Sequence, residues 1–309
     1  ITILKTIRYL SPAQLVSQVW ITLRARFEDP AGFAQKMRVA AYPGCRWSPR
    51  GKFLPPGIQQ NGRESMQKGS FSFLNVVREA GWPPRWDRED LPKHWLFNLH
   101  YFDFIWAMAF EDARFLVTNW IENCKPSRGS TGWDSYPISL RLMNLSAFFF
   151  GEHRDRTDAD VPFRDMLWDS IFLQAEWLVR HMEKNVGGNH LIENVSALAL
   201  TGSCFGGDEA GAWFRKGYRR LAKEIARQVL ADGAHFGRSP MYQCRMTYVL
   251  ATLLNTGDSR LAELVREPLC RMAGELSCVC HPDGDIALFN DSASAAYNRP
   301  VPLIEYVAK

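Results

Sequence analysis

The amino-acid sequence predicts an all-α protein whose helical hairpins form an (α/α) toroid, a complete or incomplete barrel, behind an irregular N-terminal lead-in. Apolar residues recur with a period of 3.6 through much of the chain, which is typical of helices with one buried face. Glycine-rich breaks separate these runs, and strictly alternating runs are few, so we expect few strands. The absence of a sequence repeat of fixed length disfavours a regular solenoid.

Length and composition exclude several classes of protein. A chain of 309 residues fits one large toroid or two ordinary domains. Hydrophobic residues make up 46% and charged residues 23%, which excludes disorder of the whole chain. The formal net charge of +4 suits an anionic ligand, but no Lys/Arg block is dense enough to predict nucleic-acid binding. No apolar run approaches the roughly 18 residues of a membrane-spanning helix.

Residues 1–92 form the predicted lead-in. From residue 40 onward the lead-in is rich in Pro, Gly, Trp and Arg. We expect a helix and ordered loops here rather than a linker, because the side chains of Phe71, Phe73, Trp82 and Trp86 need burial.

Residues 93–280 form the predicted toroid. Its charged stretch 151–161 is expected to be a surface loop, and the 3.6-residue period predicts helices on either side of it. These helices cover residues 104–121, 167–182, 214–229, 246–254 and 261–272. Residues 281–309 begin with turn residues and form a third region, an exit segment.

Three segments are more polar than a plain core requires. In the first, Gly187 and Gly188 end one helix and the next begins near Asn189, so Asn189 and His190 face whatever opens at that end. Asn189 alone could simply be the N-cap of the new helix, a position that Asn favours. His190 beside it and Asn194 one turn later supply more amide and imidazole groups than a cap needs.

The second segment, residues 232–242, places Arg238 and Tyr242 at a loop-to-helix junction. A neighbouring arginine can lower the pKa of a tyrosine hydroxyl below its usual value of about 10. Such a tyrosine can act as general acid or base. The structural alternative is a tyrosine that forms a hydrogen bond at the edge of the core.

The third segment is residues 97–103, with residues 132–141 as its companion. Both mix aromatic rings with polar groups, as sugar-binding subsites do, and the alternative is an aromatic core with polar caps. The candidate side chains are His100, Tyr101, Tyr136 and Arg141.

The sequence predicts no metal and no cofactor. Cys278, Cys280 and His281 are closely spaced, but structural zinc sites need a second ligand pair that this region lacks. Seven scattered cysteines, an odd number, also argue against a full disulfide framework.

Taken together, these segments resemble blocks of the heparinase II/III family of polysaccharide lyases, in the order found in the family's N-terminal toroid. The matching blocks are Arg8–Gln14, Phe97–Asp103, Gly188–Asn194, Asp232–Tyr242 and Gly284–Asp291. The resemblance implies an (α/α) toroid that continues into a C-terminal β-sandwich domain of the same parent protein. The given chain has no signal peptide, so a cytoplasmic and a periplasmic location in a bacterium both stay open.

The resemblance also implies β-elimination of a uronate-containing acidic polysaccharide. Such a lyase must neutralise the uronate carboxylate, remove the C5 proton and protonate the departing O4. By motif position the catalytic residues are Asn189, His190 and Tyr242. The side chains predicted to bind substrate are Arg238, Asn194, His100, Tyr101, Tyr136, Arg141 and His235. Gly237 and Gln243 depart from the Glu and His that the family often has, so we expect altered electrostatics around Tyr242.

Two other functions stay open at this point. A non-catalytic saccharide-binding or scaffold module in polysaccharide assembly would bind uronates without cleaving them. A toroid glycoside hydrolase would need two carboxylates on opposite sides of the bond. Asp134, Glu193 and Asp232 are available for that role, but the sequence pairs none of them.

Overall fold

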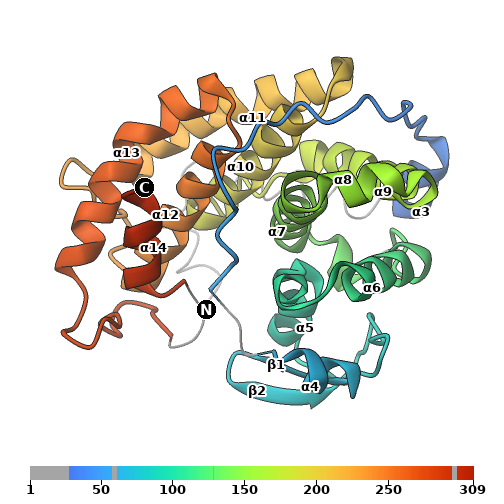
Figure 1. Ribbon diagram of the computed structural model, residues 1–309, viewed down its shortest axis with the longest axis horizontal. Coiled ribbons are helices and arrows are strands. Elements are labelled where there is room, and N and C mark those ends of the chain that lie inside the picture. Colours follow the sequence, from blue (N-terminus) through green and yellow to red (C-terminus); the bar gives the residue numbers. More distant parts are fainter. Residues whose placement is uncertain (1–27, 58–60, 128, 294–297) are drawn as a thin grey trace, which may run out of the picture.

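The body of the protein consists of an inner and an outer row of helices (Figure 1). A computed structural model describes residues 28–57, 61–127, 129–293 and 298–309. The inner row contains α5 (Lys93–Tyr101), α7 (Ser135–Leu145), α10 (Gly188–Cys204) and α12 (Pro240–Asn255), each packed against the next. The outer row contains α6 (Phe110–Asn123), α9 (Val161–His181), α11 (Gly207–Gln228) and α13 (Ser259–Cys278). This arrangement confirms the predicted (α/α) toroid architecture.

The two rows differ in how their helices are buried. In α10 every residue from Leu191 to Cys204 is buried, and in α7 every residue from Pro137 to Leu145. Such helices are surrounded by protein and have no polar face. By contrast, α11 buries Trp213, Phe214 and Leu221 on one side and carries charged residues on the other. The outer row therefore produces most of the 3.6-residue period seen in the sequence.

Two glycines let α10 and α11 approach closely. A Cβ atom on Gly217 of α11 would lie 2.5 Å from the backbone nitrogen of Ala199 in α10. A Cβ atom on Gly202 of α10 would lie 2.4 Å from the backbone nitrogen of Phe214. Neither position has room for a side chain, so these glycines set the spacing between the inner and outer rows at this point.

The described part of the lead-in contains regular elements and packed loops. It contains α3 (Pro30–Lys36), α4 (Arg63–Gln67) and an antiparallel hairpin of β1 (Ser70–Phe73) and β2 (Val76–Glu79), with Ser70 paired to Glu79. Of the aromatic side chains expected to be buried, Phe71, Phe73 and Trp86 are buried, and Trp82 is half-buried.

A loop of the lead-in docks on the C-terminal end of α10. The Trp47 indole donates a hydrogen bond of 2.9 Å to the Ser203 hydroxyl, and Cys45 forms an antiparallel bridge with Phe205. Figure 1 shows this segment, in blue, crossing the helical body near α10 and α11. This loop is therefore part of the packed structure.

The expectation of a surface loop at residues 151–161 is wrong. The chain continues from α7 through a π-helical turn, η3 (Ser146–Glu152), into α8 (Arg154–Ala159), and α9 begins at Val161. The charges that suggested a loop form pairs on a solvent-facing helix, such as Arg154 with Asp158 one turn later. Thr157 turns inward, where its hydroxyl donates to the Phe149 carbonyl.

The predicted helix at residues 104–121 is divided in two. A 3-10 turn, η1 (Asp103–Ala107), comes before α6, and a second short 3-10 turn, η2 (Thr131–Trp133), precedes α7. Asn144 of α7 holds η1 in place, since its amide donates to the Asp103 carboxylate and accepts from the Trp106 indole. These tertiary contacts override the local helical pattern.

The remaining predicted helices are confirmed as α9, α11, α12 and α13. The exit segment includes α14 (Pro300–Val307), which packs against α12 and α13. The boundaries at residues 92 and 280 stay predictions, and the block Arg8–Gln14 lies outside the described residues. None of the helices in the described ranges has both the length and the hydropathy to traverse a lipid bilayer.

Candidate functional site

The N-terminal ends of three inner helices meet at one place. Tyr136 lies in the first turn of α7 and His190 in the first turn of α10, and their rings stack with centroids 4.3 Å apart. Arg245 of α12 reaches the same place and binds Glu193 of α10. Because helix N-termini carry partial positive charge and free N–H groups, this convergence favours an anionic ligand. We define the inner-helix site by Tyr136, Asn189, His190 and Tyr242.

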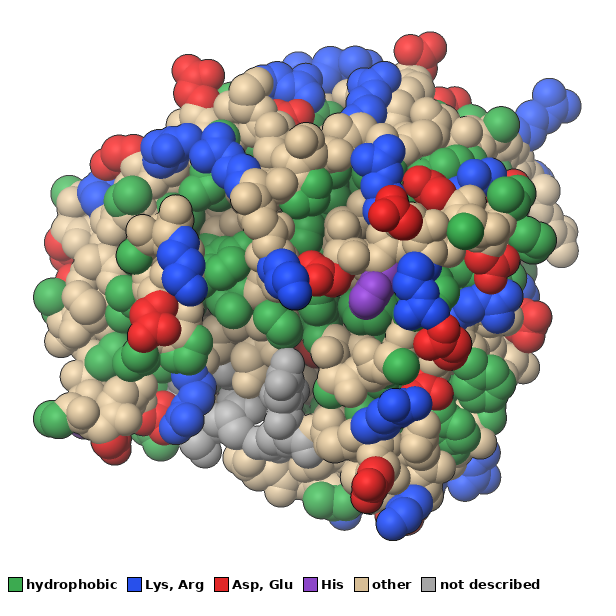
Figure 2. Space-filling view, viewed as in Figure 1, with side chains coloured by type: hydrophobic (Ala, Val, Ile, Leu, Met, Phe, Trp, Pro, Cys, Tyr) green, Lys and Arg blue, Asp and Glu red, His purple; other side chains and the backbone are tan. Residues whose placement is uncertain are grey.

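The face of the molecule seen in Figure 1 is hollowed between the α12–α14 side and the α5–α7 side, as Figure 2 shows. Lys and Arg side chains lie around this hollow, interspersed with Asp and Glu. The Lys and Arg side chains of this mixed rim can attract a polyanion.

A buried ion pair connects the helices that carry the inner-helix site. The Glu193 carboxylate is fully buried and accepts two hydrogen bonds from the Arg245 guanidinium, at 2.7 and 3.1 Å. It also accepts one from the Tyr136 hydroxyl at 2.9 Å. Burial and the Glu193 charge raise the pKa of Tyr136 well above its usual range, so this phenol stays protonated. Three inner helices are thus tied together by one carboxylate.

Arg245 is a residue that the sequence interpretation missed, and Glu193 appeared there only as a possible hydrolase carboxylate. A signal existed, because both are charged residues inside otherwise apolar helices. Arg245 also follows Tyr242 by three positions, a spacing that places both on one face of α12.

Asn189 is not the N-cap of α10. The cap position belongs to Gly187, whose φ of +70° suits glycine, and the helix begins at Gly188. The Asn189 side chain is half-buried and makes no hydrogen bond to another residue in the described ranges. Its amide is therefore available to a ligand at the positive end of α10.

His190 is held by an acidic neighbour. Its Nδ1 atom lies 3.0 Å from an oxygen of Glu183, in the turn between α9 and α10. Burial works against the charged imidazole, but the hydrogen bond and charge of Glu183 outweigh it and raise the pKa of His190. The result favours a cationic side chain beside Asn189.

Tyr242 lies in the first turn of α12. The Ser239 hydroxyl accepts the Tyr242 backbone N–H, and Pro240 occupies the first helical position. The Tyr242 hydroxyl donates to the Asp291 carboxylate at 2.8 Å. Burial and this carboxylate raise the pKa of Tyr242 to about 12, opposite to the lowering that a neighbouring arginine would produce. The Glu193 charge adds to the rise, which places Tyr242 within electrostatic reach of the buried ion pair.

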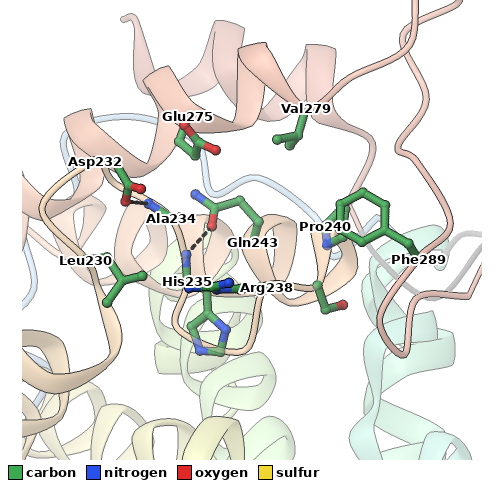
Figure 3. A pocket seen from close by; sticks show the side chains of 11 residues that line it. Leu230, Asp232, Ala234, His235, Arg238, Pro240, Gln243, Glu275, Val279 and Phe289 are labelled. Atoms are coloured by element: carbon green, nitrogen blue, oxygen red, sulfur yellow. Dashed lines mark hydrogen bonds between the residues drawn. The ribbon is translucent and has the colours of Figure 1, made fainter.

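Arg238 and His235 lie in the loop before α12, beside a pocket of about 260 Å³ (Figure 3). Arg238 is exposed and adopts a left-handed backbone conformation, with φ of +50°. His235 is 2% exposed, and burial lowers its pKa to about 4, so it is neutral at pH 7. Arg238 can meet a ligand, whereas His235 supports the loop.

Gln243, one of the two departures from the family pattern, closes this loop from inside. Its amide oxygen accepts the His235 backbone N–H, as the dashed line in Figure 3 shows. Its amide nitrogen donates to the carbonyls of Gly233 and Met272. The other departure, Gly237, donates its N–H to His235 Nδ1. Both residues are used in shaping the loop that presents Arg238.

Three of the residues predicted to bind substrate lie in the core. His100, Arg141 and Asn194 are all 0% exposed. Arg141 donates to Gln174 and to the carbonyls of His100 and Gly132, and it lies 4.0 Å above the Trp120 ring. These contacts place the side chains behind the site, away from solvent. Tyr101 is also buried, and its ring packs against Tyr136 at 5.8 Å.

Among the described residues, one group could offer three ligand atoms to a metal ion. It consists of Asp87, His100 and Cys124, whose ligand atoms lie within 4.8 Å of one another. Two neighbours oppose that use. The Trp120 indole already donates to His100 Nδ1, and the charged guanidinium of Arg141 packs against His100. We therefore assign the inner-helix site no metal from this group.

The fold and site define a helical-toroid protein with a polar site at the converging N-termini of its inner helices. The family described as heparinase II/III N-terminus matches residues 88–301, more than half of the chain, and the protein belongs to this family.

The similar proteins include a heparin-sulfate lyase of Bacteroides thetaiotaomicron, 30% identical over 204 residues. That match covers 58% of this chain and 28% of the relative. The crystal structure of a heparan sulfate lyase from Pedobacter heparinus is 17% identical, with a TM-score of 0.53, and covers 90% of this chain and 45% of that one. A heparinase III crystal structure is 18% identical, with a TM-score of 0.50, over 93% and 49% of the two chains. The chain thus spans under half the length of these proteins, and the structural matches show the fold alone.

Proposed function

We propose that this protein is part of a polysaccharide lyase that cleaves a uronate-containing acidic polysaccharide by β-elimination. The observation that carries the proposal is the inner-helix site at converging helix N-termini, which combines three groups. They are the Asn189 amide, which has no partner among the described residues, the His190 imidazole, whose pKa is raised, and the protonated Tyr242 phenol. Membership of the heparinase II/III family supports the reaction class, and the similarity to a heparin-sulfate lyase supports a sulfated uronate polymer.

In this proposal Asn189 and His190 bind the uronate carboxylate. The Asn189 amide donates a hydrogen bond and His190 donates a charge-assisted one, so that negative charge developing on the carboxylate is stabilised. Both groups lie in the first turn of α10, whose dipole adds to the effect.

Tyr242 carries out the proton transfers. The pKa of about 12 keeps the phenol protonated at neutral pH, which suits donation to the departing O4. To take the C5 proton, Tyr242 must first lose its own, and the Asp291 carboxylate is the acceptor in contact with it. The C5–H and C4–O4 bonds break, a C4=C5 double bond forms, and O4 leaves with the proton.

The other predicted residues divide into two groups. Arg238, exposed at the rim, can bind a carboxylate or sulfate through two parallel hydrogen bonds. Tyr136 is half-buried and stacks its ring on His190. We assign the buried members a supporting role behind the site: His100, Tyr101, Arg141, Asn194 and His235.

A second function deserves a test because the match covers 28% of the lyase relative. A module of this kind can bind an acidic saccharide, or act as a scaffold, without cleaving it. We further propose that turnover uses a C-terminal β-sandwich domain of the parent protein.

The test is ultraviolet-monitored cleavage, since β-elimination creates an absorbing unsaturated uronate. The panel contains heparin, heparan sulfate, chondroitin, hyaluronan and alginate, each offered to this chain and to its longer parent. Product from the parent establishes the lyase and ranks the substrates. Binding of the polymers without product from either protein would instead establish the binding module.

A further inference from the structure

Glu183 lies outside the helices and outside every block on which the family resemblance rests. It occupies the turn between α9 and α10, one residue beyond the α9 C-cap, Met182. Its carbonyl accepts the backbone N–H groups of Val186 and Gly187, at 3.2 and 2.9 Å, so the turn closes around it. The backbone at Glu183 is therefore fixed by the turn.

A buried amide clamps Glu183 on a second side. Asn194, 0% exposed, accepts the Glu183 backbone N–H at 2.7 Å and donates from its amide nitrogen to the Glu183 carboxylate at 3.2 Å. The same amide nitrogen donates to the Ser139 hydroxyl of α7 at 3.0 Å. Asn194 thus holds both the backbone and the carboxylate of Glu183 in one orientation.

The held carboxylate faces His190. One Glu183 oxygen is engaged by Asn194, and the other lies 3.0 Å from His190 Nδ1. An ionised carboxylate only accepts hydrogen bonds, so Nδ1 carries the proton in either charge state of the ring. Nε2 is then the nitrogen left for a ligand, and it becomes a donor when the ring is cationic.

The groups around His190 favour that cationic state. Glu183 faces it from the α9–α10 turn, Glu193 acts on it from its own helix, and Tyr136 of α7 stacks on its ring. Arg245 of α12 is paired with Glu193 and opposes the cation. The direct contact with Glu183 is the strongest of the favourable interactions, since Arg245 largely offsets the charge of Glu193.

We propose that Glu183 is a positioning residue of the inner-helix site, which fixes the His190 imidazole through Nδ1 and presents a charged Nε2–H to the substrate carboxylate. This inference rests on the proposed function for its catalytic consequence. The effect of Glu183 on the pKa of His190 concerns the protein alone and can be measured without substrate.

The experiment uses Glu183→Gln, which keeps the shape and a hydrogen-bonding group but removes the charge. Glu267→Gln on α13 is the matched control, because it removes the same charge from an exposed ion pair with Arg271. The imidazole signals of the seven histidines are titrated by NMR, and His190→Gln identifies the His190 signal. Cleavage of the best substrate is measured over the same pH range.

We expect the titration midpoint of the His190 imidazole to move to lower pH in Glu183→Gln and to stay unchanged in Glu267→Gln. We also expect kcat/KM at neutral pH to fall roughly 10- to 100-fold, the equivalent of one charge-assisted hydrogen bond. The loss of activity with rising pH should set in earlier, since the required imidazolium disappears at lower pH.

An unchanged His190 midpoint in Glu183→Gln would overturn the proposal whatever the activity. A midpoint that moves while the pH profile of cleavage does not would also overturn it, since Glu183 would then have no role in turnover. If the wild-type protein and its parent cleave nothing although the midpoint moves, the proposed function fails and the hold of Glu183 on His190 stands.

Discussion

Arg245 and Glu193 form a bidentate ion pair between α12 and α10, with the Glu193 carboxylate wholly buried and Arg245 11% exposed. The pair joins two inner helices whose first turns carry Tyr242 and His190. Because the charges are paired and the third contact of Glu193 is the Tyr136 hydroxyl, the arrangement fixes all three helix ends relative to one another.

Arg245→Leu is expected to destabilise the protein by about 3–5 kcal/mol, because it leaves the Glu193 charge buried and unpaired. Adding Glu193→Leu should restore part of the loss, since no charge is then left in the core. Urea unfolding measures the free energy of unfolding of the single and the double variant. The control is Arg63→Leu, which breaks an exposed pair with Asp112 and should cost less than about 1 kcal/mol. Equal losses for Arg245→Leu and Arg63→Leu would contradict the account.

Gly217→Ala tests the close contact of α10 and α11. The new methyl group would overlap the backbone of Ala199 and Val195, so we expect a loss of about 1–3 kcal/mol. Gly274→Ala in α13 is the matched control, because a Cβ atom there meets nothing within 4 Å. That change should stabilise the helix by about 0.5–1 kcal/mol. Thermal unfolding that gave the two variants the same sign would count against the described packing.

Acid should weaken the protein through His235. Its pKa is about 4 in the folded state and about 6.5 when unfolded, so the unfolded chain binds the extra proton first. The contribution of the neutral His235 side chain to the free energy of unfolding is complete above pH 6.5. It is lost as the pH falls toward 4. Urea unfolding across this range should show a shallower loss for His235→Gln than for the wild type. His94→Gln, at an exposed position, should leave the slope unchanged.

Asp291→Asn tests the partner of the Tyr242 hydroxyl. Removal of the carboxylate charge takes away one cause of the raised pKa of Tyr242, so the phenol should ionise at lower pH. The amide of the variant cannot take the Tyr242 proton as the carboxylate does, so kcat/KM should fall. Its rise with pH should move to lower pH, because the phenol then ionises to solvent more readily. Asp165→Asn, an exposed residue of α9, serves as the charge control. A pH profile identical to that of the wild type would remove Asp291 from the mechanism.

Much of the fold could be predicted from the sequence because the outer helices face solvent on one side. In α11 and α13 apolar residues lie on the buried face and charged residues on the solvent face, so the 3.6-residue period is visible in the sequence. The charged residues 151–161 misled for the same reason, since a polar solvent face and a polar loop have similar compositions. The break before α6 had no local signal, because Asn144 enforces it from another helix.

The candidate site was predictable in part. Asn189, His190 and Tyr242 could be found because glycines and a Ser-Pro pair mark the helix starts on which they lie. The burial of His100 and Arg141 could not be predicted from the sequence. Whether a polar side chain points inward depends on partners in other helices, here Gln174 and Trp120. The clamp on Glu183 depends on the packing of α10 against its preceding turn and has no sequence signature.

The most direct test of the central claim is ultraviolet-monitored cleavage of heparan sulfate by the parent protein proposed above and by its Tyr242→Phe and Asn189→Ala variants. Tyr242→Phe removes one hydroxyl that contacts Asp291, and Asn189→Ala removes an amide without a described partner, so both variants should fold. We predict product from the wild type and at least a roughly 100-fold loss in each variant. Cleavage that survives both substitutions would contradict the assignment of the inner-helix site as the catalytic centre.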